Sequence, residues 1–326
     1  MKDYAKGVMS IIAPCYNGEN YISRFLESIL SQTYTKIQLI VVNDGSTDKT
    51  EEILKEYEEK FAESGMEFVH FFQKNQGIGG AINNALKYVT GEYLSWFGTD
   101  DYALPIYAEK MAAFLQENPD YAVVRCDGFL VDENDTTNIK GLFALNNNDK
   151  HNPNLFENAI LEKGFHFGYS VLRMDVFDQC NPSREIYPSR QGQNWQLLLP
   201  VFYEHKAAFI DEPLYCVVDN SSSVSRNPHK SYKKTQEQNL EYEKILTKVL
   251  NSMNIPDREK YMRIVTEKYI RRRMLAAINF EQYEDAVVEY DLLKQHGTAT
   301  WKDFERILRV KYPVINKVAK LLKKSK

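Results

Sequence analysis

Ile37-Gln-Leu-Ile-Val-Val-Asn43 leads directly into Asp44-Gly-Ser-Thr-Asp48, and Tyr93-Leu-Ser-Trp-Phe97 leads into Gly98-Thr-Asp-Asp101. Each apolar run has the length and composition of a buried strand, and each places acidic residues where the strand ends. In an open α/β sheet, ligands bind at the carboxyl ends of the strands. The two stretches therefore predict a site for a hydroxyl-rich ligand, or for a divalent cation that holds a phosphate.

Strand-like and helix-like segments alternate around these stretches, which predicts an α/β fold with a mainly parallel sheet flanked by helices. The predicted strands are 8–13, 37–43, 67–73, 93–97, 122–126, 169–173, 207–210 and 214–218. The predicted helices are 22–30, 53–61, 78–89 and 194–203, with a further helix opened by Pro105 at its first position. Asp48-Lys-Thr-Glu51 has the spacing of a capping box. The Asn- and Asp-rich stretch 132–154 predicts a long surface loop.

The pattern changes after about Ser225, because alternation stops and helical periodicity continues to the end. We therefore expect one domain over 1–226 and a helical region over 227–326. The last segment, 306–326, holds eight Lys or Arg and no acid. It fits either a basic amphipathic helix on an anionic membrane surface or a solvated helix whose cations suit the helix dipole.

Composition excludes several classes of protein. A net charge of −4 and a pI near 6.0 argue against a general nucleic-acid binder. Four cysteines without a CxxC pair predict reduced, mostly buried thiols in a cytoplasmic protein. The N-terminus does not resemble a signal peptide, and no apolar run approaches the roughly 18 residues of a membrane span.

The Gly-rich segment Gln76-Gly-Ile-Gly-Gly-Ala-Ile82 follows a strand and opens a helix, but Ile82 stands where a dinucleotide fingerprint needs Gly or Ala. A nicotinamide cofactor is therefore not expected. Asp44 can accept a hydrogen bond from a ribose hydroxyl or a base N–H, or can simply cap the next helix. Asp100 and Asp101 can hold Mg²⁺ or Mn²⁺ against a diphosphate, or can form an ordinary acidic turn.

Several motifs together resemble family 2 glycosyltransferases. They are Ala13-Pro-Cys-Tyr-Asn-Gly-Glu19, Val41-Val-Asn-Asp-Gly-Ser-Thr-Asp48, Asn75-Gln-Gly77, Thr90-Gly-Glu-Tyr93 and Gly98-Thr-Asp-Asp101. The resemblance is close over the first 100 residues and looser to about residue 226. It implies a GT-A fold, a UDP-sugar donor, a divalent metal and inversion at the anomeric carbon. Residues 1–101 would form the nucleotide-sugar half of the domain and 102–226 the acceptor half.

The resemblance also implies roles for individual residues. Asp44 would contact the base, Asp100 would bind the metal, and Asp101 would contact the reacting sugars as a catalytic residue. The nucleotide would lie among Pro14, Tyr16, Asn17, Glu19, Asp44, Asp100, Ser225 and Arg226. Ser223 belongs to the same Ser-rich loop, and Lys74 and Arg190 are weaker candidates for phosphate contacts.

Two departures from the family pattern bear on catalysis. Gly98 stands where the metal motif often has its first Asp, and Gln193 and Asn194 stand where the family has a Glu-Asp pair. That Asp is normally the general base, and a neutral amide cannot take a proton. Three interpretations follow. Another group could be the base, with Asp127, His166 and Asp211 as candidates, or the amides could only orient the acceptor while the proton is lost late. In the third interpretation, the chain is a weak or inactive transferase.

The sequence thus predicts a metal-dependent transferase of hexosyl or N-acetylhexosaminyl groups. Its acceptor would be a glycan or lipid-linked saccharide in bacterial capsule or exopolysaccharide biosynthesis, at the inner face of the cell membrane. The alternative is a non-catalytic nucleotide-sugar or glycan-binding subunit that retains the fold. A nucleotidyltransferase is disfavoured, since Pro14-Cys-Tyr-Asn-Gly18 is not a basic, Gly-rich phosphate loop.

Overall fold

The computed structural model describes residues 3–144, 150–163, 167–220 and 231–311 of the 326-residue chain. The chain divides into two compact units, Met1–Asn220 and Ser221–Lys326. The boundary expected near 226 falls between two described ranges.

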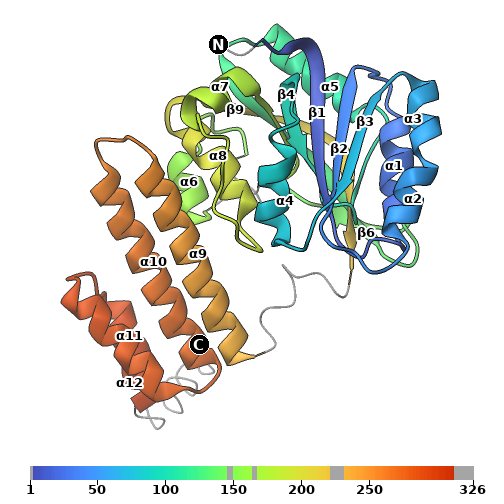
Figure 1. Cartoon of the computed structure of the whole chain (residues 1–326). Helices are drawn as coiled ribbons and strands as arrows, with labels where there is room; N and C mark the ends of the chain where they lie inside the picture. Colours follow the sequence, from blue (N-terminus) through green and yellow to red (C-terminus); the bar gives the residue numbers. More distant parts are fainter. Residues whose placement is uncertain (1–2, 145–149, 164–166, 221–230, 312–326) are drawn as a thin grey trace. The chain divides into compact units, whose positions relative to one another are not determined.

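Four parallel strands form the first half of the sheet, in the order β3-β2-β1-β4 (Figure 1). They are β1 (Ala5–Cys15), β2 (Ile37–Asn43), β3 (Glu67–Phe72) and β4 (Gly91–Trp96). Every residue of β2 is buried, because the strand lies inside the sheet and both of its faces are covered. This burial explains why its sequence is a continuous apolar run rather than an alternating one.

Helices cover both faces of this half-sheet. Met9 and Ile11 share a core with α1 (Ile22–Leu30), α2 (Thr50–Glu56), α3 (Glu58–Ser64) and α5 (Tyr107–Glu117). On the other face, α4 (Gly77–Ala85) packs on β1 and β2 (Figure 1). Side chains alternate between the faces of a strand, so neighbouring residues of β1 serve the two helix layers.

The second half of the sheet continues from β4 in the order β8-β6-β9-β5, with β7 paired to β6. Antiparallel pairs join β4 to β8, β8 to β6, β6 to β7 and β9 to β5, whereas β6 and β9 are parallel. The bounds are β5 Tyr102–Ala103, β6 Tyr121–Asp132, β7 Ile139–Leu142, β8 Ser170–Arg173 and β9 Lys206–Asp219. The helices of this half are α6 (Phe156–Leu161), α7 (Met174–Cys180) and α8 (Gln193–Glu204).

Some local expectations were wrong. Pro105 does not begin a helix, because it lies in a turn closed by Tyr107 N–H donating to the Leu104 carbonyl, where proline also fits, and α5 starts at Tyr107. The stretch 132–154 is not all loop, since it contains β7. The helix expected over 53–61 is divided into α2 and α3 at Tyr57. The two short strands expected over 207–218 form one strand, β9, whose register shifts opposite Cys126 and Asp127.

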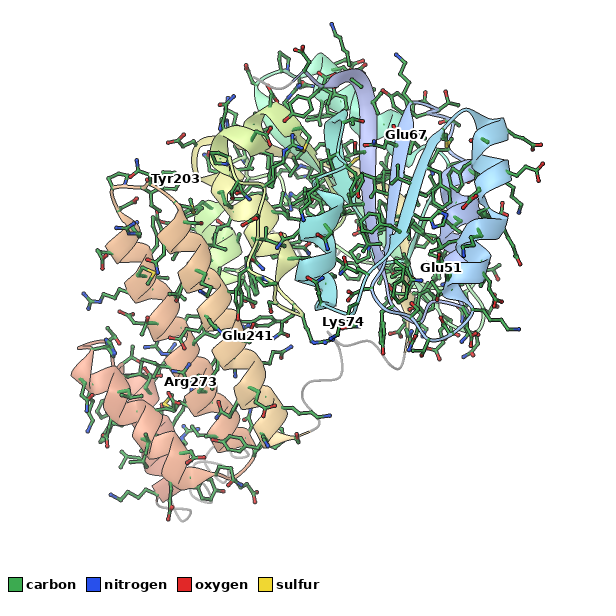
Figure 2. The ribbon with its side chains drawn as sticks, viewed as in Figure 1. Glu51, Glu67, Lys74, Tyr203, Glu241 and Arg273 are labelled. Atoms are coloured by element: carbon green, nitrogen blue, oxygen red, sulfur yellow. The ribbon has the colours of Figure 1, made fainter. Side chains whose placement is uncertain are left out.

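The second unit is helical, as expected. It contains α9 (Tyr232–Ser252), α10 (Arg258–Asn279), α11 (Tyr283–Gln295) and α12 (Trp301–Lys311). The buried Arg273 of α10 pairs with Glu243 of α9 and Glu289 of α11, and so links three helices (Figure 2). In the described residues, no helix is both long enough and apolar enough to cross a membrane.

Candidate functional site

The loops after β1 and β2 are hydrogen-bonded to each other. Asn17 N–H donates to Ser46 Oγ (2.9 Å), Asn17 Oδ1 accepts from Thr47 N–H (2.9 Å), and Gly18 N–H donates to Thr50 Oγ1 (2.8 Å). Asn17 has a φ of 49°, in the left-handed region that asparagine tolerates better than most residues. The two loops therefore form one unit at the carboxyl edge of the sheet.

Glu19 and Asp48 extend this contact. Glu19 N–H donates to Asp48 Oδ2 (2.9 Å), and Glu19 Oε2 accepts from Lys49 N–H (3.2 Å). Burial raises the pKa of Asp48, but hydrogen bonds from Thr50 and Glu19 outweigh it, so the pKa lies below its usual value. The predicted capping box is incomplete, because Glu51 accepts from the Asn43 side chain instead (2.8 Å).

Asn17 and Glu19 therefore hold the two loops together, whether or not they also contact a ligand. Pro14 lies near the end of β1, opposite Val42 of β2. Tyr16 is the first residue after β1, and half of its surface is exposed. Tyr16 is thus the aromatic side chain of this loop that is open to a ligand.

Asp44 is buried and holds the start of α4. Its Oδ1 accepts from Gln73 Nε2 (2.7 Å) and Gln76 N–H (2.8 Å), and its Oδ2 accepts from Gly77 N–H (2.8 Å). A carboxylate oxygen can accept two hydrogen bonds, so these contacts leave one acceptor position on Oδ2. The carboxylate anchors a helix and can still contact one further donor.

The Gly-rich segment serves packing. Gly79 N–H donates to the Ser189 carbonyl (2.9 Å), and a Cβ on Gly79 would lie 2.8 Å from Ser189 backbone atoms. Asn83 fixes the same segment by exchanging two hydrogen bonds with the backbone of Ile186, each 2.8 Å long. The small size of these glycines therefore allows residues 186–190 to pack closely against α4.

The weaker phosphate candidates lie near this start of α4. Arg190 Nη2 donates to Asn75 Oδ1 (2.9 Å), and its aliphatic stem lies against Gly77. Lys74 is exposed just after β3 (Figure 2).

Gly98–Asp101, here called the acidic turn, follows β4. Asp101 N–H donates to the Gly98 carbonyl (3.2 Å), and Arg24 Nη2 donates to the Asp100 carbonyl (2.7 Å). Asp101 Oδ2 accepts from the Tyr169 hydroxyl (2.5 Å), and Asp101 Oδ1 accepts from Val218 N–H (2.9 Å). The turn is thereby attached to α1, to the residue before β8 and to β9.

The acidic turn lies near the loop that follows β1, here called the β1 loop; the loop that follows β2 is the β2 loop. Burial raises the pKa of the Cys15 thiol to about 12, and the nearby Asp48 and Asp100 carboxylates add to the rise. Carboxylates after β2 and β4 therefore both lie near the end of β1, as the sequence predicted for one ligand site.

A divalent cation would find few protein ligands here. Among the described residues, no cluster of three or more His, Cys, Asp or Glu is arranged to hold a metal ion. A Cβ on Gly98 would lie 2.7 Å from Asp100 Oδ1, so the Asp100 carboxylate occupies the space beside residue 98. One carboxylate suits Mg²⁺ or Mn²⁺ only where diphosphate oxygens and water complete the shell.

The amides of the expected catalytic pair begin α8. Gly192 precedes them with a φ of 73°, and Trp96 Nε1–H at the end of β4 donates to Asn194 Oδ1 (2.7 Å). The indole N–H can only donate, which fixes the Asn194 oxygen toward Trp96 and leaves its NH₂ as the other polar group. Position 194 therefore offers hydrogen-bond donors, and Gln193 beside it is likewise neutral.

The alternative bases lie in different surroundings. Asp127 is buried, and its Oδ1 accepts from Gly128 and Ala144 N–H groups. Asp211 is exposed and pairs with Lys150 (2.5 Å) and His151 (2.8 Å), with the Lys150 hydrogen bond as the main cause of its lowered pKa. His166, Ser223, Ser225 and Arg226 lie outside the described residues.

Sequence reasoning missed three residues that hold the site: Arg24, Trp96 and Tyr169. Trp96 had a signal, because it directly precedes Phe97 and the acidic turn on a strand that ends at the site. Arg24 and Tyr169 had none, since each belongs to a segment read only as a helix or a strand.

Comparison with known proteins agrees with the motifs. The family profile described as "Glycosyl transferase family 2" matches residues 10–180. Residues of this chain are 41% identical over 128 positions to "Uncharacterized glycosyltransferase RT0329" of Rickettsia typhi, covering 39% of this chain and 38% of that protein. "Putative glycosyltransferase EpsE" of Bacillus subtilis is 29% identical over 223 residues, covering 67% of this chain and 75% of EpsE. The match thus spans well under half of the length of the first relative.

Solved structures share the fold. S. aureus TarS 1–349 in complex with UDP-GlcNAc superposes with a TM-score of 0.58 at 18% identity, covering 93% of this chain and 90% of that chain. The mannosyltransferase PcManGT from Pyrobaculum calidifontis, in complex with GDP-Man and Mn²⁺, gives a TM-score of 0.54 at 14% identity, covering 96% and 79%. The expected GT-A fold followed by a helical region is confirmed.

Proposed function

We propose that this chain, which belongs to glycosyl transferase family 2, transfers a sugar from a UDP-sugar to a glycan or lipid-linked saccharide, with inversion at the anomeric carbon. The observation that carries the proposal is the meeting of the β1 loop, the β2 loop and the acidic turn at one edge of the sheet. The UDP and UDP-GlcNAc bound by the TarS structures support a uracil nucleotide as donor.

Donor binding would use the buried Asp44 and the exposed Tyr16. Asp44 keeps one acceptor position for a base N–H, and Tyr16 offers a ring face at the end of β1. Pro14, Asn17 and Glu19 would shape this part of the site through the bonded loops. Ser225 and Arg226 remain proposed diphosphate contacts.

A divalent cation, Mg²⁺ or Mn²⁺, would be held by Asp100 and by the diphosphate of the donor. When bound, it would neutralise negative charge on the leaving UDP. The acidic turn supports this assignment by holding Asp100 on a short, hydrogen-bonded segment.

On the acceptor side, we propose that Gln193 and Asn194 orient the attacking hydroxyl. The hydroxyl oxygen bonds to the anomeric carbon as the bond from that carbon to UDP breaks, and its proton leaves late, to water or to the departing phosphate. The settings of Asp127 and Asp211 support this interpretation over a base at either residue, because one is buried and the other is paired at the surface. A group outside the described residues, such as His166, is the competing assignment.

The transfer would contribute to a bacterial surface polysaccharide, in the cytoplasm at the inner face of the membrane. The basic segment 306–326 supports contact with an anionic lipid surface. A non-catalytic nucleotide-sugar-binding subunit is the second candidate, favoured by the neutral side chain at position 194.

A donor panel tests the proposal. UDP release is measured with a series of UDP-sugars and Mn²⁺ or Mg²⁺, with and without lipid-linked saccharides. We expect metal-dependent release that Asp100→Ala lowers by about two orders of magnitude or more, because Asp100 would hold the cation at the leaving group. Glu212→Ala, which removes only a surface partner of Lys110, is the control.

Release that is unchanged in the Asp100→Ala variant would refute the metal assignment. UDP binding by calorimetry without release under any condition would favour the binding subunit.

A further inference from the structure

The Tyr169 hydroxyl bonds to both ends of the acidic turn. It donates to Asp101 Oδ2 (2.5 Å) and accepts from Gly98 N–H (3.3 Å). Tyr169 directly precedes β8 and lies 68 residues from Asp101 along the chain. One phenol oxygen therefore spans the turn that carries Asp100.

Packing fixes the ring that carries this hydroxyl. The Tyr169 ring stacks on Phe97 with centroids 4.1 Å apart and an interplanar angle of 12°, and it meets Tyr215 edge-on at 4.6 Å. Burial of the hydroxyl, followed by the charges of Asp101 and Asp100, raises the pKa of Tyr169 well above its usual value. The hydroxyl thus keeps its proton at neutral pH and donates it to Asp101.

The second carboxylate oxygen of Asp101 is also bonded within the protein. It accepts from Val218 N–H of β9 (2.9 Å), 117 residues away in sequence. Arg24 Nη2 also donates to the Asp100 carbonyl (2.7 Å). Both oxygens of Asp101 therefore attach the turn to neighbouring strands, which is the arrangement of an anchor.

We propose that Tyr169 is a positioning residue that fixes the acidic turn so that Asp100 meets the cation and the diphosphate, and that Asp101 is the anchor of this turn and not a base. The inference rests on the proposed function, since it concerns the same donor site. It differs from the family resemblance, which implied that Asp101 contacts the reacting sugars as a catalytic residue.

The first test compares Tyr169→Phe with Tyr107→Phe in the full chain. Both changes remove one hydroxyl from rings that contact Phe97, but the Tyr107 hydroxyl bonds to Ser95 and not to the acidic turn. Calorimetry measures UDP binding with saturating Mn²⁺ and with none. We expect Tyr169→Phe to weaken Mn²⁺-dependent UDP binding about tenfold, with little change for Tyr107→Phe.

Equal UDP affinity in the wild type and Tyr169→Phe would overturn the positioning role. Absence of Mn²⁺-dependent UDP binding in the wild type would instead refute the metal-assisted donor site of the proposed function. Melting temperatures of the two variants separate a local effect from a general loss of stability.

Asp101→Asn decides the role of Asp101, even if Tyr169→Phe does not fold. An asparagine can accept from Val218 N–H and donate to the Tyr169 oxygen, so it preserves the anchor while removing the charge. We expect Asp101→Ala, which removes both bonds, to weaken Mn²⁺-dependent UDP binding about tenfold, and Asp101→Asn to restore it to within about threefold of the wild type. Intact UDP binding with a loss of kcat of about a hundredfold or more would show that Asp101 is a base and overturn the anchor assignment.

Discussion

Asn194 shows how one hydrogen bond decides what a side chain can do. The indole of Trp96 donates to the Asn194 oxygen, so the amide keeps its NH₂ for other partners. A carboxylate at this position could accept the same hydrogen bond from the indole N–H and would still have further lone pairs that can accept a proton. An Asn194→Asp change would therefore keep the shape of the side chain and its Trp96 contact, and would alter only its charge and its ability to take a proton.

We predict that Asn194→Asp raises kcat by about tenfold or more, because it supplies a base where the wild type has only hydrogen-bond donors. The pH–rate profile should gain an acidic limb near about pH 4–5, the usual range of carboxylate pKa values. UDP release measured from pH 4 to 9 checks both statements.

Asn134→Asp is the matched control, since it makes the same change at an exposed residue just after β6. If Asn194→Asp leaves kcat and the pH profile unchanged, another group already takes the proton.

At the scale of elements, α4 contacts residues 186–190, which belong to the segment between α7 and α8. Gly79 permits this contact, because the backbone of Ser189 occupies the place of a side chain. Asn83 and Gln196 then hold Ile186 and Tyr187 through their backbone groups.

Gly79→Ala should lower the free energy of unfolding by about 1–3 kcal/mol, because its methyl group forces the Ser189 backbone away from α4. Gly141→Ala in β7 is the control, since its Cβ would meet no atom within 4 Å. Urea unfolding of both variants measures the difference. If the two variants have similar free energies of unfolding, residues 186–190 can move away from α4 with little loss of stability.

The sequence predicts the elements well where periodicity is local. The strands up to 97 and most helices follow from apolar runs and 3.6-residue repeats, and the acidic ends of β2 and β4 follow from strand polarity. The sequence also predicts strands at β6, β8 and β9, but it does not predict β7 or the antiparallel pairing of this half, because pairing between distant segments leaves no local pattern. The same reason hides Tyr169 and Val218, whose contacts with Asp101 span 68 and 117 residues.

At the scale of the whole molecule, the helical unit decides how the proposed membrane contact of the basic segment can be tested. Ile307 is buried in the core of this unit, and Arg306 pairs with Asp303 at the start of α12. Residues 306–311 therefore belong to a packed helix, and a test of the basic tail should begin after Lys311.

We expect a chain ending at Lys311 to bind anionic vesicles more weakly than the full chain, because residues 312–326 contain five lysines and no acid. Sedimentation with vesicles containing anionic lipid measures this binding, and neutral vesicles are the control. Added salt should weaken binding of the full chain. Equal sedimentation of the two chains would exclude the tail as a membrane contact.

The hydrogen bonds between the β1 and β2 loops have a practical consequence for engineering. The N–H groups of Asn17, Gly18 and Glu19 donate to side-chain oxygens of the second loop. The Asn17 and Glu19 side chains accept from backbone N–H groups of the same loop. A chimaera that imports only one of these loops from a relative would leave the donors and acceptors of these hydrogen bonds unmatched, including the buried Gly18 N–H. Attempts to retarget the donor should therefore transplant residues 15–21 and 43–51 as a single cassette.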